Sequence, residues 1–191
     1  IDNGFTGEND ALGGHNTGAF RLQFLWQASD RFSALLNLHG WELDGTARVF
    51  RANILKPGSN DLASGFSQDK VYQDGLNDQE ISSQGGAFTL NYEFDFGTLT
   101  AITGYETLDM FSRGDIDGGF GAVFAPPSGP GFIPFPSESA DGLPELDQFT
   151  QEIRLASDTG GAWDWLVGFF YFDESLQADS FSYNSLGGNV Q

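Results

Sequence analysis

The sequence contains no cysteine, so disulfide bonds and thiolate metal sites are excluded. Basic residues are also scarce: Lys and Arg number 8 against 27 Asp and Glu, and the formal net charge is −19. Because contacts with phosphate groups need Lys and Arg, this balance argues against nucleic-acid binding. It argues equally against adsorption to an anionic lipid surface through a polybasic patch.

Long hydrophobic runs are missing as well, and none approaches the roughly 20 residues that a membrane-spanning helix needs. The strands of a membrane-spanning β-barrel alternate in polarity, so that architecture stays open. The chain is rich in aromatic residues and glycine, with 19 Phe, 5 Tyr, 4 Trp and 26 Gly among 191 residues. This bias favours β structure. The chain starts at Ile1 without methionine or a signal peptide, and we expect a processed protein or a fragment.

The clearest strand pattern lies at 148–172, QFTQEIRLASDTGGAWDWLVGFFYF. Apolar and polar side chains alternate up to Leu155 and alternate again from Trp163 onward, which is typical of strands whose two faces meet different surroundings. The segment 157–161 between them is rich in residues that tolerate tight turns. The pattern predicts a hairpin near 148–176.

The predicted register of this hairpin places Leu155 opposite Trp163 on one face. Arg154 then lies opposite Asp164 on the polar face, and Trp165 points the other way. A slip of one residue would turn both charges toward the apolar side. If that side meets the middle of a bilayer, a basic residue there costs roughly 2–4 kcal/mol. We therefore expect the avoidance of lipid by charged groups to set the register.

Two further hairpins are expected near 17–41 and 84–108. The connection in the first has three residues and the connection in the second has two, and such short loops fix the register. In the first hairpin this register pairs apolar with apolar and polar with mostly polar side chains, which supports it. The predicted pairs are Ala28–Phe32, Trp26–Ala34, Phe24–Leu36, Leu22–Leu38, Gln27–Ser33, Gln23–Asn37 and Arg21–His39 in the first hairpin, and Tyr92–Leu99, Leu90–Ala101, Phe88–Thr103 and Gly86–Tyr105 in the second.

Long polar segments separate the hairpins, at about 42–83 and 109–146. Connections of this length are far above the usual handful of residues and are usually functional. The prolines of the second segment exclude paired strands there. Short turns thus fall at one end of the sheet and long loops at the other, as in outer-membrane barrels. The pattern predicts an all-β fold, an antiparallel up-and-down meander of about six strands that forms part of a transmembrane β-barrel.

Several stretches resemble TonB-dependent outer-membrane receptors, and together they cover nearly the whole chain. QFTQEIRLAS followed by WDWLVGFFYFDESL is similar to a mid-barrel hairpin of that family. LTAITGYETLDMFSRGDIDGG resembles the preceding strand and loop. RLQFLWQASDRFSALLNLHGWELDGTARVFRANILKPG resembles the hairpin before that. The resemblance identifies residues 1–191 as part of such a barrel, with the segments 42–83 and 109–146 as extracellular loops.

The resemblance implies active uptake of a nutrient, such as an iron–siderophore complex, across the outer membrane of a Gram-negative bacterium. The implied partners are outer-membrane lipid, the remainder of the barrel, its plug, the energy-transducing TonB complex and an unidentified small-molecule ligand. The sequence shows no plug, no energy-coupling box and no final strand that ends in an aromatic residue. We therefore expect a six-strand segment of a longer receptor, with the contact to the TonB complex made by the missing N-terminal part.

Metal-binding signals in the sequence are weak. Asp115 and Asp117, followed by Gly118, resemble the start of a calcium loop but lack its later ligands and terminal glutamate, so an acidic turn is the favoured interpretation. His39 falls on the polar face of its predicted strand, where lining of a barrel lumen is favoured over metal ligation. His15, the other histidine, lies in a glycine-rich loop. We expect no metal site.

Catalytic signals are weak too. Glu93, Glu106 and Glu152 could be mistaken for a catalytic set of carboxylates. They fall on different strands of a regular polar face, which favours solvated side chains. No nucleophile elbow, phosphate loop or metal-ligand spacing occurs. We expect no enzymatic activity and no cofactor, and the ligand-binding residues stay unidentified. The alternative to the receptor is a secreted soluble β-sandwich binding module of the lectin-like kind.

The aromatic residues predict two bands of outward-pointing rings. Trp and Tyr favour a membrane interface, where the apolar ring and the polar tip are both satisfied. An apolar zone about 25 Å tall should separate the bands. Tryptophans packed between two sheets would contradict this prediction. The expected members are Trp26, Phe94, Trp163 and Trp165 near the short turns, and Tyr105 and Tyr171 toward the long loops.

Overall fold

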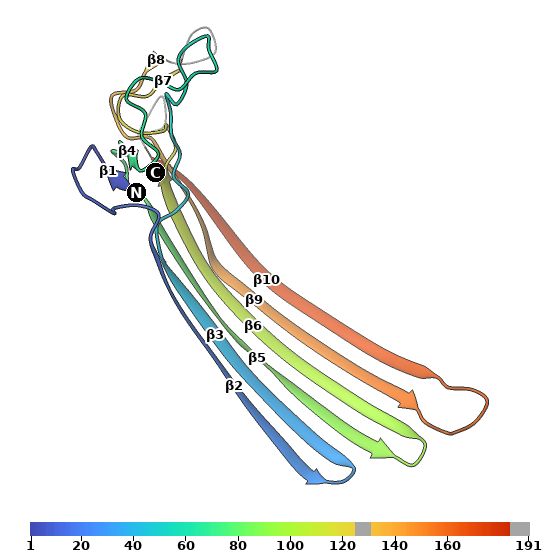
Figure 1. Ribbon diagram of the computed structural model, residues 1–191. Helices are drawn as coiled ribbons and strands as arrows, with labels where there is room; N and C mark the ends of the chain where they lie inside the picture. Colours follow the sequence, from blue (N-terminus) through green and yellow to red (C-terminus); the bar gives the residue numbers. More distant parts are fainter. Residues whose placement is uncertain (125–130, 184–191) are drawn as a thin grey trace.

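The computed structural model describes residues 1–124 and 131–183, with the side chain of Phe124 left out (Figure 1). The regular structure of these residues is entirely β, which confirms the predicted all-β class. The long strands are β2 (His15–Ser29), β3 (Phe32–Gly45), β5 (Asp78–Phe94), β6 (Gly97–Asp115), β9 (Glu138–Ser157) and β10 (Leu166–Tyr183). The short strands are β1 (Asp2–Asn3), β4 (Lys70–Val71), β7 (Val123–Phe124) and β8 (Gly131–Phe132).

The six long strands form one antiparallel sheet with the order β10-β9-β6-β5-β3-β2. Each long strand pairs with the long strand that follows it in the chain, so the predicted up-and-down meander of six strands is confirmed. The sheet is open, with β2 and β10 at its edges. Figure 1 shows a single curved layer with the three hairpin connections at one end and the longer connecting loops gathered at the other. No helix in the described residues is long and apolar enough to cross a membrane.

The first two registers follow the prediction closely. All four predicted pairs of the second hairpin occur. Every predicted pair of the first hairpin occurs except one: Phe32 pairs with Ser29 instead of Ala28. The reason is a β-bulge, since the register shifts between Gln27 and Ser29. The bulge leaves one residue unpaired and shortens the turn to two residues.

The predicted register of the third hairpin is wrong. Leu155 pairs with Val167 rather than with Trp163, a difference of four residues, and Arg154 pairs with Gly168. Residues share a face when their positions differ by an even number, so a shift of four leaves every side chain on the same face. The avoidance of lipid by charged groups therefore cannot choose between these two registers.

The connection between β9 and β10 explains the shift. It is not a tight turn but a loop that spans 158–165. The backbone N–H of Ser157 donates to the carbonyl of Trp165 at 2.8 Å, which closes the loop at its base. Trp163 and Asp164 lie inside this loop, outside both strands. Asp164 therefore does not pair with Arg154 in the sheet, and the predicted strand faces of Asp164 and Trp165 do not apply.

The strands also extend further than their apolar patterns indicate. The hairpins occupy 15–45, 78–115 and 138–183, and the loops between them shorten to 46–77 and 116–137. Pairing continues through polar sequence because the backbone supplies the ladder hydrogen bonds. Pro144, expected in a loop, lies within β9 beside a register shift, where a missing N–H is tolerated.

Buried side chains gather mainly in the loops, not in the sheet. Segments 1–14, 46–77, 116–124 and 131–137 pack together into a unit that we call the loop cap. Within it β1 pairs with β4 in parallel, and the Asn3 side chain donates to the carbonyl of Gln73 at 2.9 Å. The buried apolar residues of the loop cap are Leu12, Ala47, Val71, Ala122 and Ile133.

Substitution of Gly97 should destabilise the sheet. A Cβ atom at this position would overlap the backbone carbonyl of Ala156 in the neighbouring strand. We expect Gly97→Val to lower the free energy of unfolding by about 1–3 kcal/mol, the usual range for overpacking. Thermal and denaturant unfolding of the protein in detergent micelles would measure it. Gly18→Val is the matched control, because a Cβ atom there meets nothing within 4 Å. Equal effects of the two substitutions would contradict the steric explanation.

Candidate functional site

One face of the sheet carries a continuous zone of apolar side chains that we call the apolar belt. Its members share a face because they alternate along each strand and stand opposite one another across the ladders. The belt comprises Leu22, Phe24, Trp26, Phe32, Ala34, Leu36, Leu38, Phe88, Leu90, Tyr92, Phe94, Leu99, Ala101, Tyr105, Phe149, Ile153, Leu155, Val167, Phe169 and Tyr171.

The belt begins at the tight-turn end of the sheet. Along β5 it runs from Phe94 to the position of Gly86, eight residues away, where Leu38 and Tyr105 lie on the neighbouring strands. At about 3.3 Å per residue this distance is about 26 Å along the strands. If the strands tilted by about 40°, as in membrane barrels, the belt would be about 20 Å tall, somewhat less than the roughly 25 Å expected.

The belt has no covering layer in the part of the chain that the structure describes. Phe24, Trp26 and Phe169 are 64%, 54% and 60% exposed, respectively. Burying one large apolar side chain stabilises a protein by roughly 1.5–3 kcal/mol, so an uncovered face of this size forgoes a large stabilisation. The face therefore needs an apolar surrounding that the described residues do not supply.

Aromatic rings form a row at the tight-turn end. Neighbouring ring centroids lie 5.9 Å apart for Trp26 and Phe32, 6.5 Å for Phe32 and Tyr92, 4.7 Å for Tyr92 and Phe94, and 5.2 Å for Phe94 and Phe96. The row crosses β2, β3 and β5, so it links the first two hairpins on the same face.

The other predicted aromatic positions differ in how well they match. Trp163 and Trp165 are 84% and 44% exposed in the loop 158–165, and neither is packed between two sheets. At the opposite border of the belt, the Tyr105 hydroxyl donates to the Asp147 carboxylate at 2.6 Å. Tyr105 thus keeps its ring on the apolar side and its polar tip toward the long loops, as predicted. Tyr171 lies nearer the middle of the belt, opposite Gln151.

The opposite face of the sheet carries many polar side chains, although the edge strand β10 also places Phe170 and Phe172 on it. His39 Nε2 and Glu106 Oε2 lie 3.0 Å apart, across the position of Gly85 in β5. A Cβ atom on Gly85 would overlap the Glu106 carboxylate, so the missing side chain makes room for the contact. The prediction placed His39 on this polar face but missed the pairing, because nothing in the sequence indicates that two residues 67 positions apart will meet.

The three glutamates considered as a catalytic set are not brought together. Glu152 lies opposite Ile102, four residues along β6 from Glu106, which is about 13 Å. Glu152 pairs with Arg154 at 3.1 Å, and Glu93 lies near the tight-turn end, opposite Thr98. Carboxylates about 13 Å apart cannot share a proton or act on one substrate atom. The three glutamates therefore fit the predicted role of solvated side chains on the polar face.

A compact acidic cluster lies where β6 enters the loop cap. Carboxylate oxygens of Asp74, Asp115 and Asp117 lie within 4.8 Å of one another. Asp115 is fully buried and Asp117 is 5% exposed. The Asp117 carboxylate accepts backbone N–H donors from Gly119 at 2.8 Å and Ser137 at 3.1 Å, so two loop segments converge on it.

Burial, together with the hydrogen bond and the charge of Asp115, raises the pKa of Asp117 to about 6, although the backbone N–H donors lower it. Burial also raises the pKa of Asp115, and burial together with the charge of Asp117 raises that of Asp74. Asp74 Oδ1 is shielded from solvent and has no hydrogen-bond partner in the described residues. Carboxylate oxygens are the kind of ligand that a hard cation such as Ca²⁺ prefers. Three carboxylates supply fewer than the 6–8 oxygen ligands that Ca²⁺ usually takes. The sequence indicated two members of the cluster and gave no sign of Asp74.

The acidic cluster should make opening of the loop cap depend on pH. A carboxyl with a raised folded-state pKa contributes stability below its unfolded pKa near 3.9, and that contribution is lost as pH rises through the folded value. For Asp117 the loss should be complete about one pH unit above the folded value, near pH 7. We expect amide hydrogen exchange in the loop cap, corrected for its intrinsic pH dependence, to accelerate several-fold between pH 4.5 and 7.5.

Asp74→Asn should flatten this profile, because it removes one of the three charges without changing the size of the side chain. Asp69→Asn, at an exposed position of the same loop, is the matched control and should leave the profile unchanged. A corrected exchange rate that does not vary with pH in the unsubstituted protein would contradict the prediction. Slower exchange on addition of millimolar Ca²⁺ would instead show that a cation neutralises the cluster.

No known protein-family model, curated protein or solved structure matches this chain. The resemblance of its strands to TonB-dependent receptors therefore stays a prediction from the sequence.

Proposed function

We propose that the protein is a segment of the β-barrel of an outer-membrane TonB-dependent receptor, which takes up a nutrient such as an iron–siderophore complex. The observation that carries the proposal is the single-layer sheet: no described residue covers its apolar belt or pairs with its two edges. Lipid would cover the belt, and the remainder of the barrel would pair with the edges.

The length of the free edges supports a larger sheet. β2 has 15 residues and β10 has 18, and nearly all of them are exposed on both faces. A long exposed edge presents rows of unpaired N–H and C=O groups and invites aggregation. Closure into a barrel removes the edges, and closure is the only way for a sheet to satisfy its backbone groups in lipid.

The arrangement of the connections supports a barrel that crosses a membrane. The first two hairpins turn over two residues at one end, whereas 46–77 and 116–137 lie at the other end. Outer-membrane barrels have short periplasmic turns and long extracellular loops. The long strands have 14–20 residues, more than the roughly 9–11 that cross a bilayer, so their far ends would carry the loop cap beyond the lipid.

The main polar side chain within the belt is internally satisfied. Gln151 accepts a hydrogen bond from the Thr103 hydroxyl at 2.7 Å, and its amide donates to the carbonyls of Ile102 at 3.0 Å and Glu152 at 3.1 Å. An unsatisfied amide facing hydrocarbon would cost several kcal/mol. The bonds around Gln151 thus suit a site that faces lipid.

The finer identity, a TonB-dependent receptor rather than another barrel, depends on the resemblance of the strand sequences. This identity implies that the protein lies in the outer membrane. It also implies that the plug and the contact with the TonB complex belong to parts of the receptor outside this segment. The alternative, a secreted lectin-like β-sandwich, needs a second sheet packed over the belt. The described residues form one large sheet and two sheets of two short strands, so no observation favours this alternative.

A pair of isoleucines tests whether the belt faces lipid. Ile153 lies in the belt opposite Ala101, and Ile102, next to Ala101 in β6, faces the polar side opposite Glu152. In lipid vesicles, Ile153→Lys should destabilise the folded sheet by roughly 2–4 kcal/mol near the bilayer midplane. Ile102→Lys is the matched control and should be nearly neutral, because it lies opposite Glu152. Urea unfolding from vesicles measures the free energy of unfolding of both variants. Equal losses of stability would contradict the proposal.

The absence of cysteine permits a second test that does not depend on stability. Single cysteines at Phe24 or Ile153 in the belt, and at Thr89 or Thr150 on the polar face, can carry an environment-sensitive fluorophore. In bilayers we expect blue-shifted emission and quenching by lipid-attached nitroxides at the belt positions only. Equal quenching at the four positions would contradict a lipid-facing belt. A protein that is monomeric without detergent, with its belt protected from water, would favour the β-sandwich.

A further inference from the structure

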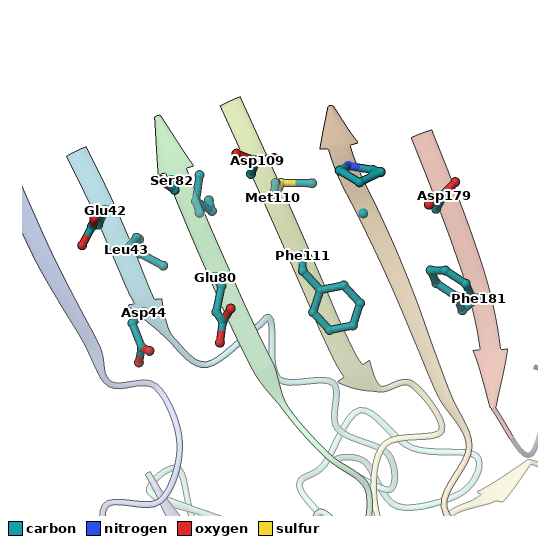
Figure 2. Close-up of a pocket in the computed structure, with 13 residues that line it drawn as sticks. Glu42, Leu43, Asp44, Glu80, Ser82, Asp109, Met110, Phe111, Asp179 and Phe181 are labelled. Atoms are coloured by element: carbon teal, nitrogen blue, oxygen red, sulfur yellow. The ribbon is translucent and has the colours of Figure 1, made fainter. Parts of the chain in front are cut away.

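A groove of about 570 Å³ crosses the sheet beyond the apolar belt, toward the loop cap (Figure 2). Its lining residues come from β3, β5, β6, β9 and β10. Adjacent strands lie about 4.8 Å apart, so a groove across five strands is about 19 Å long. Glu42 pairs with Ser82 and is four residues from Leu38 along an unbroken ladder, which places the groove on the same face as the belt.

The groove is acidic along its length. Glu42, Asp44, Glu80 and Asp109 are exposed, and none of them forms a side-chain hydrogen bond or ion pair with the residues that the structure describes. None of the lining residues is basic. These carboxylates come from three strands, and Figure 2 shows them following one another across the sheet. The groove thus presents a line of uncompensated negative charge.

One end of the groove has apolar walls. Figure 2 shows the rings of Phe111 and Phe181 on β6 and β10, on either side of β9. Between them lies Gly142, which pairs with Phe111, and a Cβ atom there would come within 3.7 Å of the Phe111 ring. The absence of a side chain at Gly142 keeps the space between the two rings open. An apolar side chain of a ligand can enter it.

We propose that this groove docks an extended peptide segment of a partner protein that carries lysine or arginine together with apolar residues. A strand of about six residues spans 19 Å and matches the length of the groove. Its basic side chains would complement the four carboxylates, and its apolar side chains would occupy the space between the phenylalanines. The phosphates of a lipid headgroup would be repelled by the same carboxylates, and a bare divalent cation would leave the apolar walls unused.

The docking site goes beyond the receptor function and does not require the belt to face lipid. The charges are exposed, so their attraction is screened by salt and contributes mainly to specificity and to the rate of association. The apolar walls should slow dissociation, because a side chain enclosed between two rings is removed from water.

Binding can be measured by fluorescence anisotropy on the protein in zwitterionic detergent micelles. The probe is a labelled peptide of alternating Lys and Leu, about six residues long to match the groove. The triple variant Asp44→Asn, Glu80→Gln, Asp109→Asn should weaken binding by roughly tenfold or more, and raised salt should weaken binding to the unsubstituted protein. The matched control triple variant removes equal charge at the tight-turn end and should stay within about twofold; its substitutions are Asp30→Asn, Glu93→Gln and Asp158→Asn.

Two further comparisons separate the two parts of the site. Phe111→Ser should weaken binding severalfold while leaving the salt dependence unchanged, because it removes an apolar wall and no charge. A peptide in which Glu replaces Lys should not bind. Equal loss in the two triple variants would overturn the proposal by showing attraction to net charge alone. Equal binding of the Glu peptide, no binding of the Lys peptide, or binding of Ca²⁺ alone at the same carboxylates would overturn it as well.

Discussion

The structure depends on the antiparallel backbone ladder that joins the six long strands. Little else holds the sheet together, since Ala34 and Ala140 are the only buried apolar residues that the described long strands contribute. A backbone hydrogen bond has a net value of only about 0.5–1.5 kcal/mol in water but about 4–6 kcal/mol in an apolar medium. The ladder and the apolar belt therefore reinforce each other: an apolar surrounding that covers the belt also strengthens the bonds beneath it.

The sequence predicted most of the sheet because alternation and short turns are local signals. They were sufficient for the strand order, for the faces of the sheet and, except at the β-bulge beside the first turn, for the registers of the first two hairpins. These signals failed in the third hairpin, because two registers satisfy the alternation equally well. The Leu155–Trp163 and Leu155–Val167 registers put the same side chains on the same faces, and only the length of the loop 158–165 distinguishes them. Strand ends were also missed, because pairing continues into polar sequence that has no alternation.

The polar sites could not be predicted in the same way, because their members come together through pairing between distant segments. Asp115 and Asp117 stood out by their spacing, but Asp74 joins them from another loop. His39 and Glu106 meet only because β5 places a glycine between them. The four uncompensated carboxylates of the groove fall on three strands whose alignment is fixed far away, at the tight turns. In each case the residue types are visible in the sequence, and their proximity follows from the register.

The internal bonding of the loop cap has a consequence for recognition. The Asn3 and Asp117 side chains bond to backbone groups of other segments, and the Gln73 amide bonds to a backbone carbonyl 23 residues away in its own segment. At Gly118, a Cβ atom would overlap Ala52. Segments held in this way have already lost most of their conformational entropy on folding. Ordering flexible groups is a main cost of association, so a ligand that meets this surface would bind to a pre-organised shape. Its selectivity would then come from complementarity to a fixed surface rather than from loops that close around it.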